Sequence, residues 1–259
     1  MSTPLLLRVL TTELMKIRRT LALWMVVIAP LVVVLLNFLV AYVGAAQVAK
    51  RTPDVWAMTT RQTVALWTVL MMPLFLTLET ALLAGVEHAE RNWKSVLALP
   101  PPRWMFYISK LIVTTALLWT AHAVLVGGTL ASGAVLSAWK PVLNIHALPL
   151  DGLLSPMLRV SATALCATTV QHWVSLRWQS FTGAMGFGMC AMVTGFIAVN
   201  SADYGPWFPW SMSMYAIRAG AAASAVAADP SSRVLLIGIA GAAVASVAGA
   251  IEFSRREIH

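Results

Sequence analysis

Six stretches of the chain are long enough and apolar enough to cross a membrane as helices. A helix needs about 20 apolar residues to cross roughly 30 Å of hydrocarbon, and none of the six shows the alternating pattern of barrel strands. The predicted spans are residues 21–43, 62–86, 105–130, 156–176, 181–199 and 233–253. The polar run Gln171-His172-Trp173 interrupts the fourth near its end. The pattern predicts an all-α membrane protein with six transmembrane helices.

The N-terminal segment, residues 1–20, is amphipathic rather than uniformly apolar. Thr3-Pro4 is typical of a helix start. One predicted face carries Arg8, Thr12, Lys16 and Arg19, and the other carries Leu6, Leu7, Leu10, Leu14, Ile17 and Leu21. This pattern predicts a helix lying in the membrane interface, with its basic face towards anionic lipid.

A charged segment separates the second and third predicted spans. At 100° per residue, one helical face of residues 87–99 carries Glu87, Glu90, Arg91 and Lys94, and the opposite face carries Ala89, Trp93, Val96 and Leu97. Three prolines at 100–102 end the pattern. We expect a short amphipathic helix on the membrane surface that is accessible from water. The alternative is a solvated loop anchored by Trp93.

Two further segments before the C-terminus have distinctive patterns. Residues 204–228 begin with aromatic residues and prolines and continue as an alanine-rich stretch, which predicts a re-entrant or interfacial segment with Trp207 and Trp210 at headgroup depth. In the last span, Gly241, Ala245 and Gly249 recur every four residues, which predicts close helix packing.

Composition and charge agree with a membrane protein. The chain of 259 residues is 59% hydrophobic and 11% charged, whereas soluble domains carry about 25% charged residues. The net charge of +8 arises from residues near the span ends, so it indicates contact with membrane lipid and not with nucleic acid. Eleven Lys and Arg residues fall on the side of the termini and seven on the other, which predicts cytoplasmic termini. No linker divides the chain, so residues 1–259 form one predicted domain.

The sequence lacks the motifs of several enzyme classes. It contains no GxxxxGK[ST], HExxH, GxSxG or CxxC pattern. The five histidines are scattered, and Cys166 and Cys190 stand alone within apolar runs. We therefore expect no ATPase activity, metal or cofactor in this chain.

Three polar residues inside the predicted spans are candidates for a role within the membrane, namely Asn37, Glu79 and His122. Glu79 lies about 10 Å from the cytoplasmic end of its span, at 1.5 Å per residue. It could contact a cation, a proton or a gate. It could also form an interhelical hydrogen bond to His122, Asn37 or Thr77, which is the interpretation that we favour, and Asn37 and His122 are then packing polar groups.

The order of these features resembles the permease subunit of a type-2 ABC transporter. The matching residues are the run from Glu13 to Arg19, the run from Glu87 to Lys94, and Leu97-Ala98-Leu99-Pro100, followed by Arg103 and Lys110-Leu111. The layout is similar over the whole chain, but the specific motif covers only about 25 residues. Within this family, the motif and Phe208-Pro209-Trp210-Ser211 most resemble permeases of lantibiotic-immunity and bacitracin-resistance exporters.

The resemblance implies several further expectations. A separate ABC ATP-binding subunit, carrying ATP and Mg, would dock on residues 87–99, and Glu87, Glu90, Arg91, Trp93 and Lys94 would supply the contacts. The permease would act with a second copy or a paralogue in a bacterial cytoplasmic (inner) membrane, exporting an amphiphilic peptide, antibiotic or lipid-like substrate. A membrane scaffold or assembly factor without transport has the same topology and remains the alternative. An intramembrane enzyme is disfavoured by the missing motifs.

Overall fold

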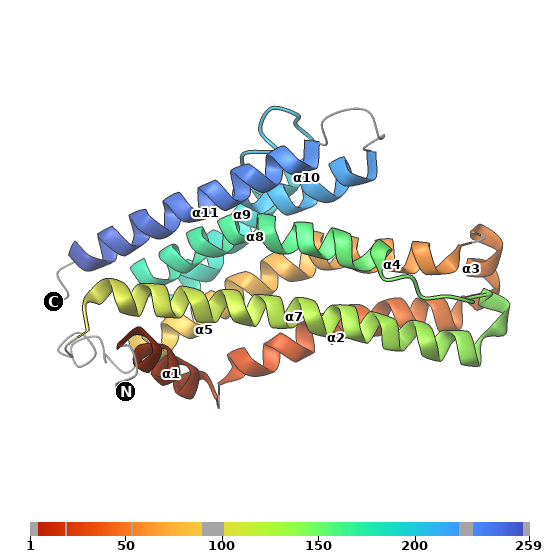
Figure 1. The fold of residues 1–259 in the computed structure, drawn as a ribbon, viewed down its shortest axis with the longest axis horizontal. Coiled ribbons are helices and arrows are strands. Elements are labelled where there is room, and N and C mark those ends of the chain that lie inside the picture. Colours follow the sequence, from red (N-terminus) through yellow and green to blue (C-terminus); the bar gives the residue numbers. More distant parts are fainter. Residues whose placement is uncertain (1–4, 19, 53, 90–100, 223–229, 256–259) are drawn as a thin grey trace.

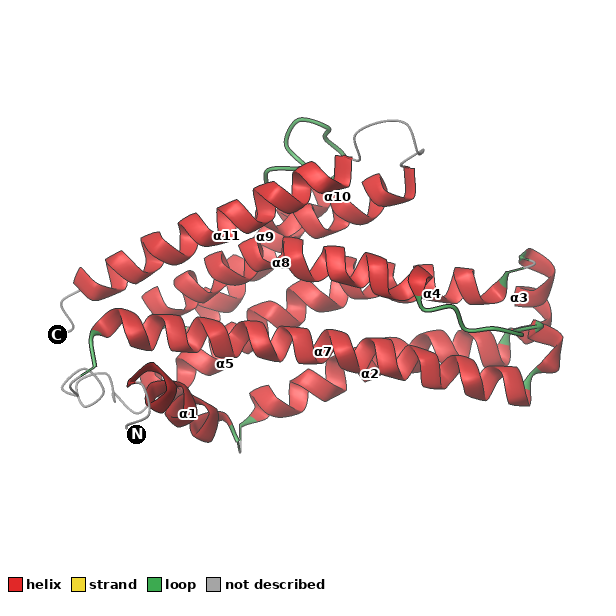
Figure 2. Cartoon of the chain, in the orientation of Figure 1, coloured by secondary structure: helices red, strands yellow, loops and turns green. Residues whose placement is uncertain are grey.

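The structure, a computed structural model, describes residues 5–18, 20–52, 54–89, 101–222 and 230–255. Within these ranges it contains helices and no strands (Figure 2). The helices are α1 (Leu5–Ile17), α2 (Leu21–Val43), α3 (Ala45–Arg51), α4 (Val55–Leu66), η1 (Trp67–Met71), α5 (Met72–Ala89), α7 (Arg103–Trp139), η2 (Pro141–Leu143), α8 (Asp151–Arg177), α9 (Phe181–Ala198), α10 (Pro209–Ala222) and α11 (Pro230–Arg255). The prediction of an all-α fold is confirmed.

Six of the helical segments are long and apolar enough to cross a membrane, as the hydrophobic pattern predicts. The first has the predicted bounds, Leu21–Val43. The second is longer than predicted, Val55–Val86, and consists of α4, η1 and α5 in continuous succession. It begins at Val55 because the Asp54 side chain accepts a hydrogen bond from the Ala57 amide, 2.8 Å away, and so caps the first turn.

The third span also exceeds its predicted bounds. Helix α7 has 37 residues and so is about 55 Å long, well beyond the hydrocarbon thickness of about 30 Å. Apolarity alone predicts an end near Leu130, but the helix continues because its later turns pack against other elements. A Cβ atom at Gly133 would meet the Trp56 ring, and Leu136 is fully buried.

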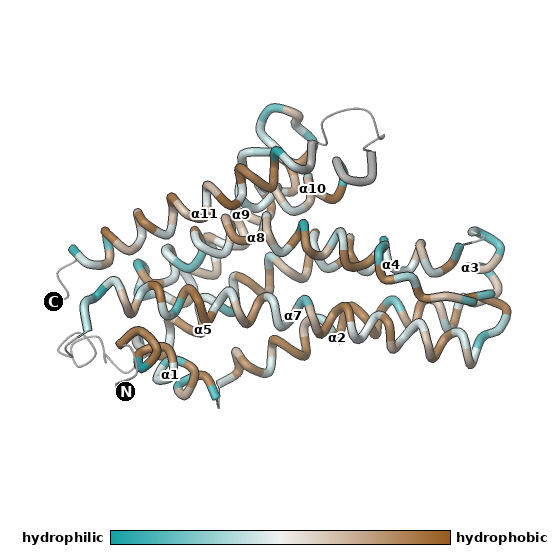
Figure 3. Tube along the Cα trace, viewed as in Figure 1, coloured by the Kyte–Doolittle hydropathy of each residue, from teal (hydrophilic) through white to brown (hydrophobic). Residues whose placement is uncertain are grey.

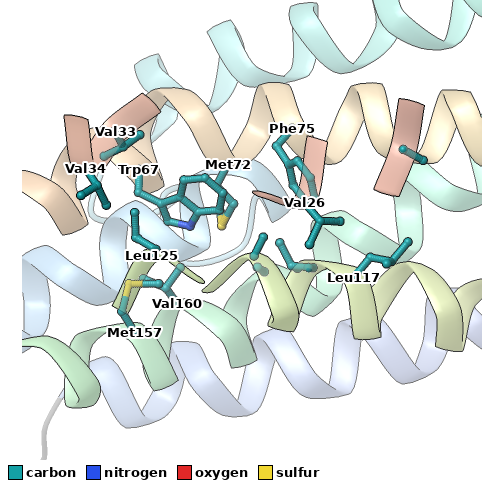
Figure 4. Packing of buried hydrophobic residues seen from close by; sticks show 14 of the residues in the cluster. Val26, Val33, Val34, Trp67, Met72, Phe75, Leu117, Leu125, Met157 and Val160 are labelled. Carbon is teal, nitrogen blue, oxygen red and sulfur yellow. The ribbon is translucent and has the colours of Figure 1, made fainter. Parts of the chain in front are cut away.

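Helix α8 occupies the middle of the bundle and packs against α11 and α10 on one side and α5 and α7 on the other. Helix α2 packs along α7 (Figure 1). The main apolar cluster is formed where α2, α5, α7 and α8 meet around Trp67, which is completely buried (Figure 4). Much of the outward surface of α2 and α11 is also apolar, as the hydropathy colouring shows (Figure 3), and it includes the exposed Val40 and Val244. Such a surface suits contact with lipid tails.

The predicted small-residue stripe on the last span brings α11 close to its neighbours. A Cβ atom at Gly241 would lie 2.9 Å from the Cys166 Sγ of α8. Gly249 lies against the Tyr107 side chain of α7. Larger side chains at these two positions would force the helices apart, so the prediction of close packing is confirmed.

The segment after the fifth span differs in part from the sequence prediction. Turns over residues 201–208 lead into α10, which packs against α8, α9 and α11. Trp207 is exposed, but Trp210 is buried in a cluster with Leu76, Ala167 and Ala191. The prediction of headgroup depth is therefore wrong for Trp210. Its backbone approaches α9 at Gly195, where a Cβ atom would lie 2.8 Å from the Trp210 Cβ, so the ring faces the bundle.

Candidate functional site

A buried ion cluster joins α1 to α7 near one end of the bundle. The Glu13 carboxylate accepts hydrogen bonds from Lys110 Nζ at 2.6 Å and from Lys16 Nζ at 2.8 Å. Glu13 is only 3% exposed and Lys110 only 5%. Helix α1 lies beside the start of α7 at the end of the bundle that carries both labelled termini (Figure 1). The cluster therefore attaches the N-terminal helix to the third span.

Helical spacing explains why Glu13 is buried. Val9, Glu13 and Ile17 are four residues apart, so they form one face of α1, and all three are buried. Leu7 and Leu14, which the sequence places on the apolar face, are exposed on the outside of the bundle. Glu13 is not among the site residues predicted from the sequence. Two features of the sequence could have indicated it. Glu13 lies between Val9 and Ile17 on one helical face, and Lys110 lies near the end of a predicted span.

The two lysines keep Glu13 charged. Burial raises the pKa of a carboxyl group, but the positive charge of Lys110, its hydrogen bond and the contribution of Lys16 outweigh that effect. The net result is a pKa below the ordinary value for glutamate. The cluster is therefore ionised at neutral pH. Because water is largely excluded, each buried charge is stabilised mainly by the opposite charge beside it.

Contacts next to the ion cluster tie α7 to α8 and α11. Tyr107 lies one turn before Lys110, and its backbone oxygen accepts a hydrogen bond from His172 Nε2 at 3.3 Å. Because a carbonyl oxygen can only accept, Nε2 carries the proton. The Tyr107 ring also contacts the ring of His172, with centroids 5.1 Å apart, and that of Phe253. His172, which belongs to the polar run that interrupts the fourth span, therefore packs against the third span.

Polar contacts also connect α8 to α5 and α11 at this end. The Ser175 Oγ donates to Thr80 Oγ1 at 3.1 Å, and the Ser175 carbonyl accepts from the His88 ring at 3.2 Å. Arg177 forms an ion pair with Glu252 of α11. The end of α5 is therefore held by side chains of α8 immediately before the predicted surface segment.

Of the predicted docking residues, Glu87 alone falls within the residues that the structure describes. Glu87 falls in the last turn of α5, so the first part of the predicted helix at 87–99 continues the second span. Glu90, Arg91, Trp93 and Lys94 lie outside the described residues. The flanking elements, α5 ending at Ala89 and α7 beginning at Arg103, lie beside α1 (Figure 1).

The three intramembrane candidates do not come together. Glu79 is completely buried, and within the described part of the chain neither of its carboxyl oxygens has a hydrogen-bond partner. The predicted interhelical bond is therefore wrong. Asn37 donates to Val33 O at 3.0 Å and Thr77 to Pro73 O at 2.8 Å, each within its own helix. His122 contacts Ser161 Oγ through Nδ1 at 2.7 Å.

Distance along the helix explains why Glu79 and His122 are apart. The His122 ring packs against Trp67, with centroids 5.7 Å apart. Trp67 precedes Glu79 by 12 residues in the same continuous span, which corresponds to about 18 Å. His122 thus lies against Trp67 of η1, far from Glu79. Over the residues that can be described, no three His, Cys, Asp or Glu side chains gather as metal ligands.

Comparison with known proteins gives one match. The model of the family described as ABC-2 family transporter protein matches residues 9–198, which is more than half of the chain. The matched region includes the ion cluster, η1, Glu79 and the segment between the second and third spans. No curated protein and no solved structure matches the chain.

Proposed function

Because the chain belongs to the ABC-2 family of transporter proteins, we propose that this multi-pass permease subunit of an ABC transporter works as an exporter. Its cargo in this proposal is an amphiphilic peptide, antibiotic or lipid-like substrate. The permease is a membrane component and not itself the ATPase, so ATP and Mg bind a separate ABC subunit. Two permease chains, either two copies or one copy and a paralogue, enclose the route.

The observation that carries the coupling part of this proposal is the buried link between Glu13 and Lys110. The ATP-binding subunit docks on residues 87–99 through Glu87, Glu90, Arg91 and Lys94, with Trp93 holding the segment at the membrane surface. Closure of the ATP-binding subunits then displaces the ends of α5 and α7. Since Lys110 lies two turns into α7, the ion cluster makes α1 move with the third span.

The π-helical stretch η1 supplies a place where the second span can change shape. It lies between α4 and α5, and π-helical turns within α-helices are frequent at functional sites. Trp67, the first residue of η1, is completely buried against His122 of the third span. In this proposal, α5 shifts about η1 while α4 stays in place.

The apolar outer surface of the bundle supports an amphiphilic cargo. Exposed apolar side chains, such as Val40 of α2 and Val244 of α11, lie on surfaces that a second chain could share, so a strongly charged solute would lose its hydration there without compensation. A substrate that carries its own apolar surface avoids that cost.

The experiment is purification of the tagged chain from its native membranes, with measurement of vanadate-sensitive ATPase activity in the eluate. Glu87→Lys combined with Glu90→Lys is expected to remove most of this activity while membrane insertion remains normal. Lys50→Glu combined with Arg51→Glu, at the end of α3, is the matched control and is expected to retain it. Equal activity in both variants would contradict the docking site. A scaffold without transport would yield no such activity even from the unaltered chain.

A further inference from the structure

A partly open cavity of about 410 Å³ lies between α4, α8 and α10. Its polar lining includes Arg61 of α4 and Asp151, Ser155 and Arg159 of α8. Apolar residues, among them Val64 and Ile217, line the rest. The cavity thus combines two guanidinium groups and one carboxylate with an apolar wall. It belongs to neither the ion cluster nor the predicted docking segment.

The position of Arg159 places the cavity at a membrane surface. Arg159 and Arg177 lie on the same helix, 18 residues apart, which corresponds to about 27 Å. This distance is close to the hydrocarbon thickness of about 30 Å. Arg177 pairs with Glu252 at the end of the bundle near α1. Arg159 and the cavity therefore lie at headgroup depth at the opposite surface.

We propose that this cavity binds the headgroup of an aminophospholipid such as phosphatidylethanolamine. Arg61 and Arg159 bind the phosphate, because a guanidinium group presents paired donors that match phosphate oxygens. Asp151 accepts from the primary ammonium group. Val64 and Ile217 contact the glycerol and the first acyl carbons.

Size and charge favour a headgroup over a whole soluble ligand. A volume of about 410 Å³ is at the lower end of ligand pockets, which occupy about 300–1,000 Å³. It accommodates a headgroup and glycerol, while the acyl chains leave through the open side of the cavity towards the hydrocarbon. Two positive groups and one negative group also complement a headgroup that carries one phosphate and one ammonium. The inference goes beyond export and holds whether or not the chain moves lipid.

The experiment is native mass spectrometry of the full chain, purified in detergent and incubated with phosphatidylethanolamine, phosphatidylglycerol or phosphatidylcholine. We expect phosphatidylethanolamine to be retained preferentially. Arg61→Gln combined with Arg159→Gln should lower retention about tenfold, as expected for lost charge-assisted hydrogen bonds. Asp151→Asn should remove the preference for phosphatidylethanolamine over phosphatidylglycerol. Arg218→Gln is the control, because Arg218 lies on α10 but bonds to Val199 O and Asn200 Oδ1.

Two comparisons keep the result interpretable. Arg61→Lys retains the charge without the paired donors, so it should keep part of the retention, and an unchanged melting temperature in each variant shows that the fold is intact. Equal loss in Arg218→Gln, or no loss in the double variant, overturns the proposal. Full displacement of the lipid by millimolar inorganic phosphate also overturns it, because the cavity is then a site for free anions.

Discussion

The carboxylate of Glu13 lies 2.6 Å from the ammonium group of Lys110, although 97 residues separate the two in the chain. Both side chains are almost fully buried, with exposures of 4% and 5%. Lys16 adds a second, more exposed partner at 2.8 Å. An ion pair in such surroundings gives little net stability by itself, but losing one partner is costly because the other charge is left without water. The arrangement therefore fixes where α1 lies on α7.

The first prediction concerns this ion pair. Glu13→Gln removes the carboxylate that Lys110 Nζ contacts at 2.6 Å inside the bundle, so the free energy of unfolding should fall by about 3–5 kcal/mol. Titration with SDS in mixed micelles measures this change. Lys16→Met is the control, since Lys16 is partly exposed to solvent and its ion pair should contribute less than about 1 kcal/mol. Equal effects of the two substitutions would contradict the assignment of Lys110 as the principal partner.

The second prediction concerns the pH dependence of stability. The Glu13 pKa is lower in the folded chain than in an unfolded one. A carboxyl group of this kind binds its proton more readily when unfolded, so its stabilising contribution is present above the unfolded pKa. It is lost as the pH falls through the lower, folded pKa. The unaltered chain should therefore lose stability more steeply than Glu13→Gln as the pH falls below about 4.5. Parallel curves would contradict the pKa assignment.

The third prediction concerns the contact between Gly249 and Tyr107. A Cβ atom at position 249 would collide with the phenol group, which is buried and has no hydrogen-bond partner in the described residues. Gly249→Ala should therefore destabilise the chain by about 1–3 kcal/mol. Tyr107→Phe removes the hydroxyl but keeps Cζ, which would lie 2.6 Å from the new Cβ atom, so it should relieve part of that cost. Thermal melting of the two single variants and the double variant measures the coupling, and additive effects would exclude a direct contact.

The spans were predictable because membrane helices satisfy all their backbone groups internally and so depend on apolarity and length. The first span agrees at both ends, and the fifth differs by one residue, ending at Ala198. Prediction from the sequence failed where contact with another helix determines whether a side chain is buried. Trp210 is buried because Gly195 leaves room for it, and that pairing is not visible in either segment alone.

The candidate site was predictable only in part for the same reason. The charged pattern at 87–99 locates a surface between two spans, which helical periodicity can indicate. The partner of Glu13 lies in another helix, and a local pattern does not encode it. For Glu79 the sequence identified an unusual residue, but its suggested partners bond elsewhere: Asn37 and Thr77 bond within their own helices, and His122 contacts Ser161 of α8.

The fourth prediction tests the topology with both termini cytoplasmic. In a background of Cys166→Ser and Cys190→Ala, cysteines are placed singly by Ala46→Cys, Ala147→Cys, Ala228→Cys and Ser254→Cys. The first three should react with a membrane-impermeant maleimide in intact cells, and the fourth only after lysis. Ala46 and Ala147 are exposed in the folded chain, so burial does not prevent their labelling. Labelling at position 254 in intact cells would contradict this orientation.

The last prediction concerns Glu79, whose two carboxyl oxygens are buried without partners in the described residues. Glu79→Met has a similar volume and removes the unsatisfied group, so the free energy of unfolding should rise by about 1–3 kcal/mol.

A costly polar group inside a span that leads to the docking segment is expected to serve function. We therefore expect the ATPase activity of the purified complex to fall in Glu79→Met. It should fall equally in Glu79→Gln, which keeps the shape but cannot bind or release a proton. Leu78→Met, one residue away, is the control and should change neither quantity. Full activity in both Glu79 variants would show that the carboxyl group serves no step of transport.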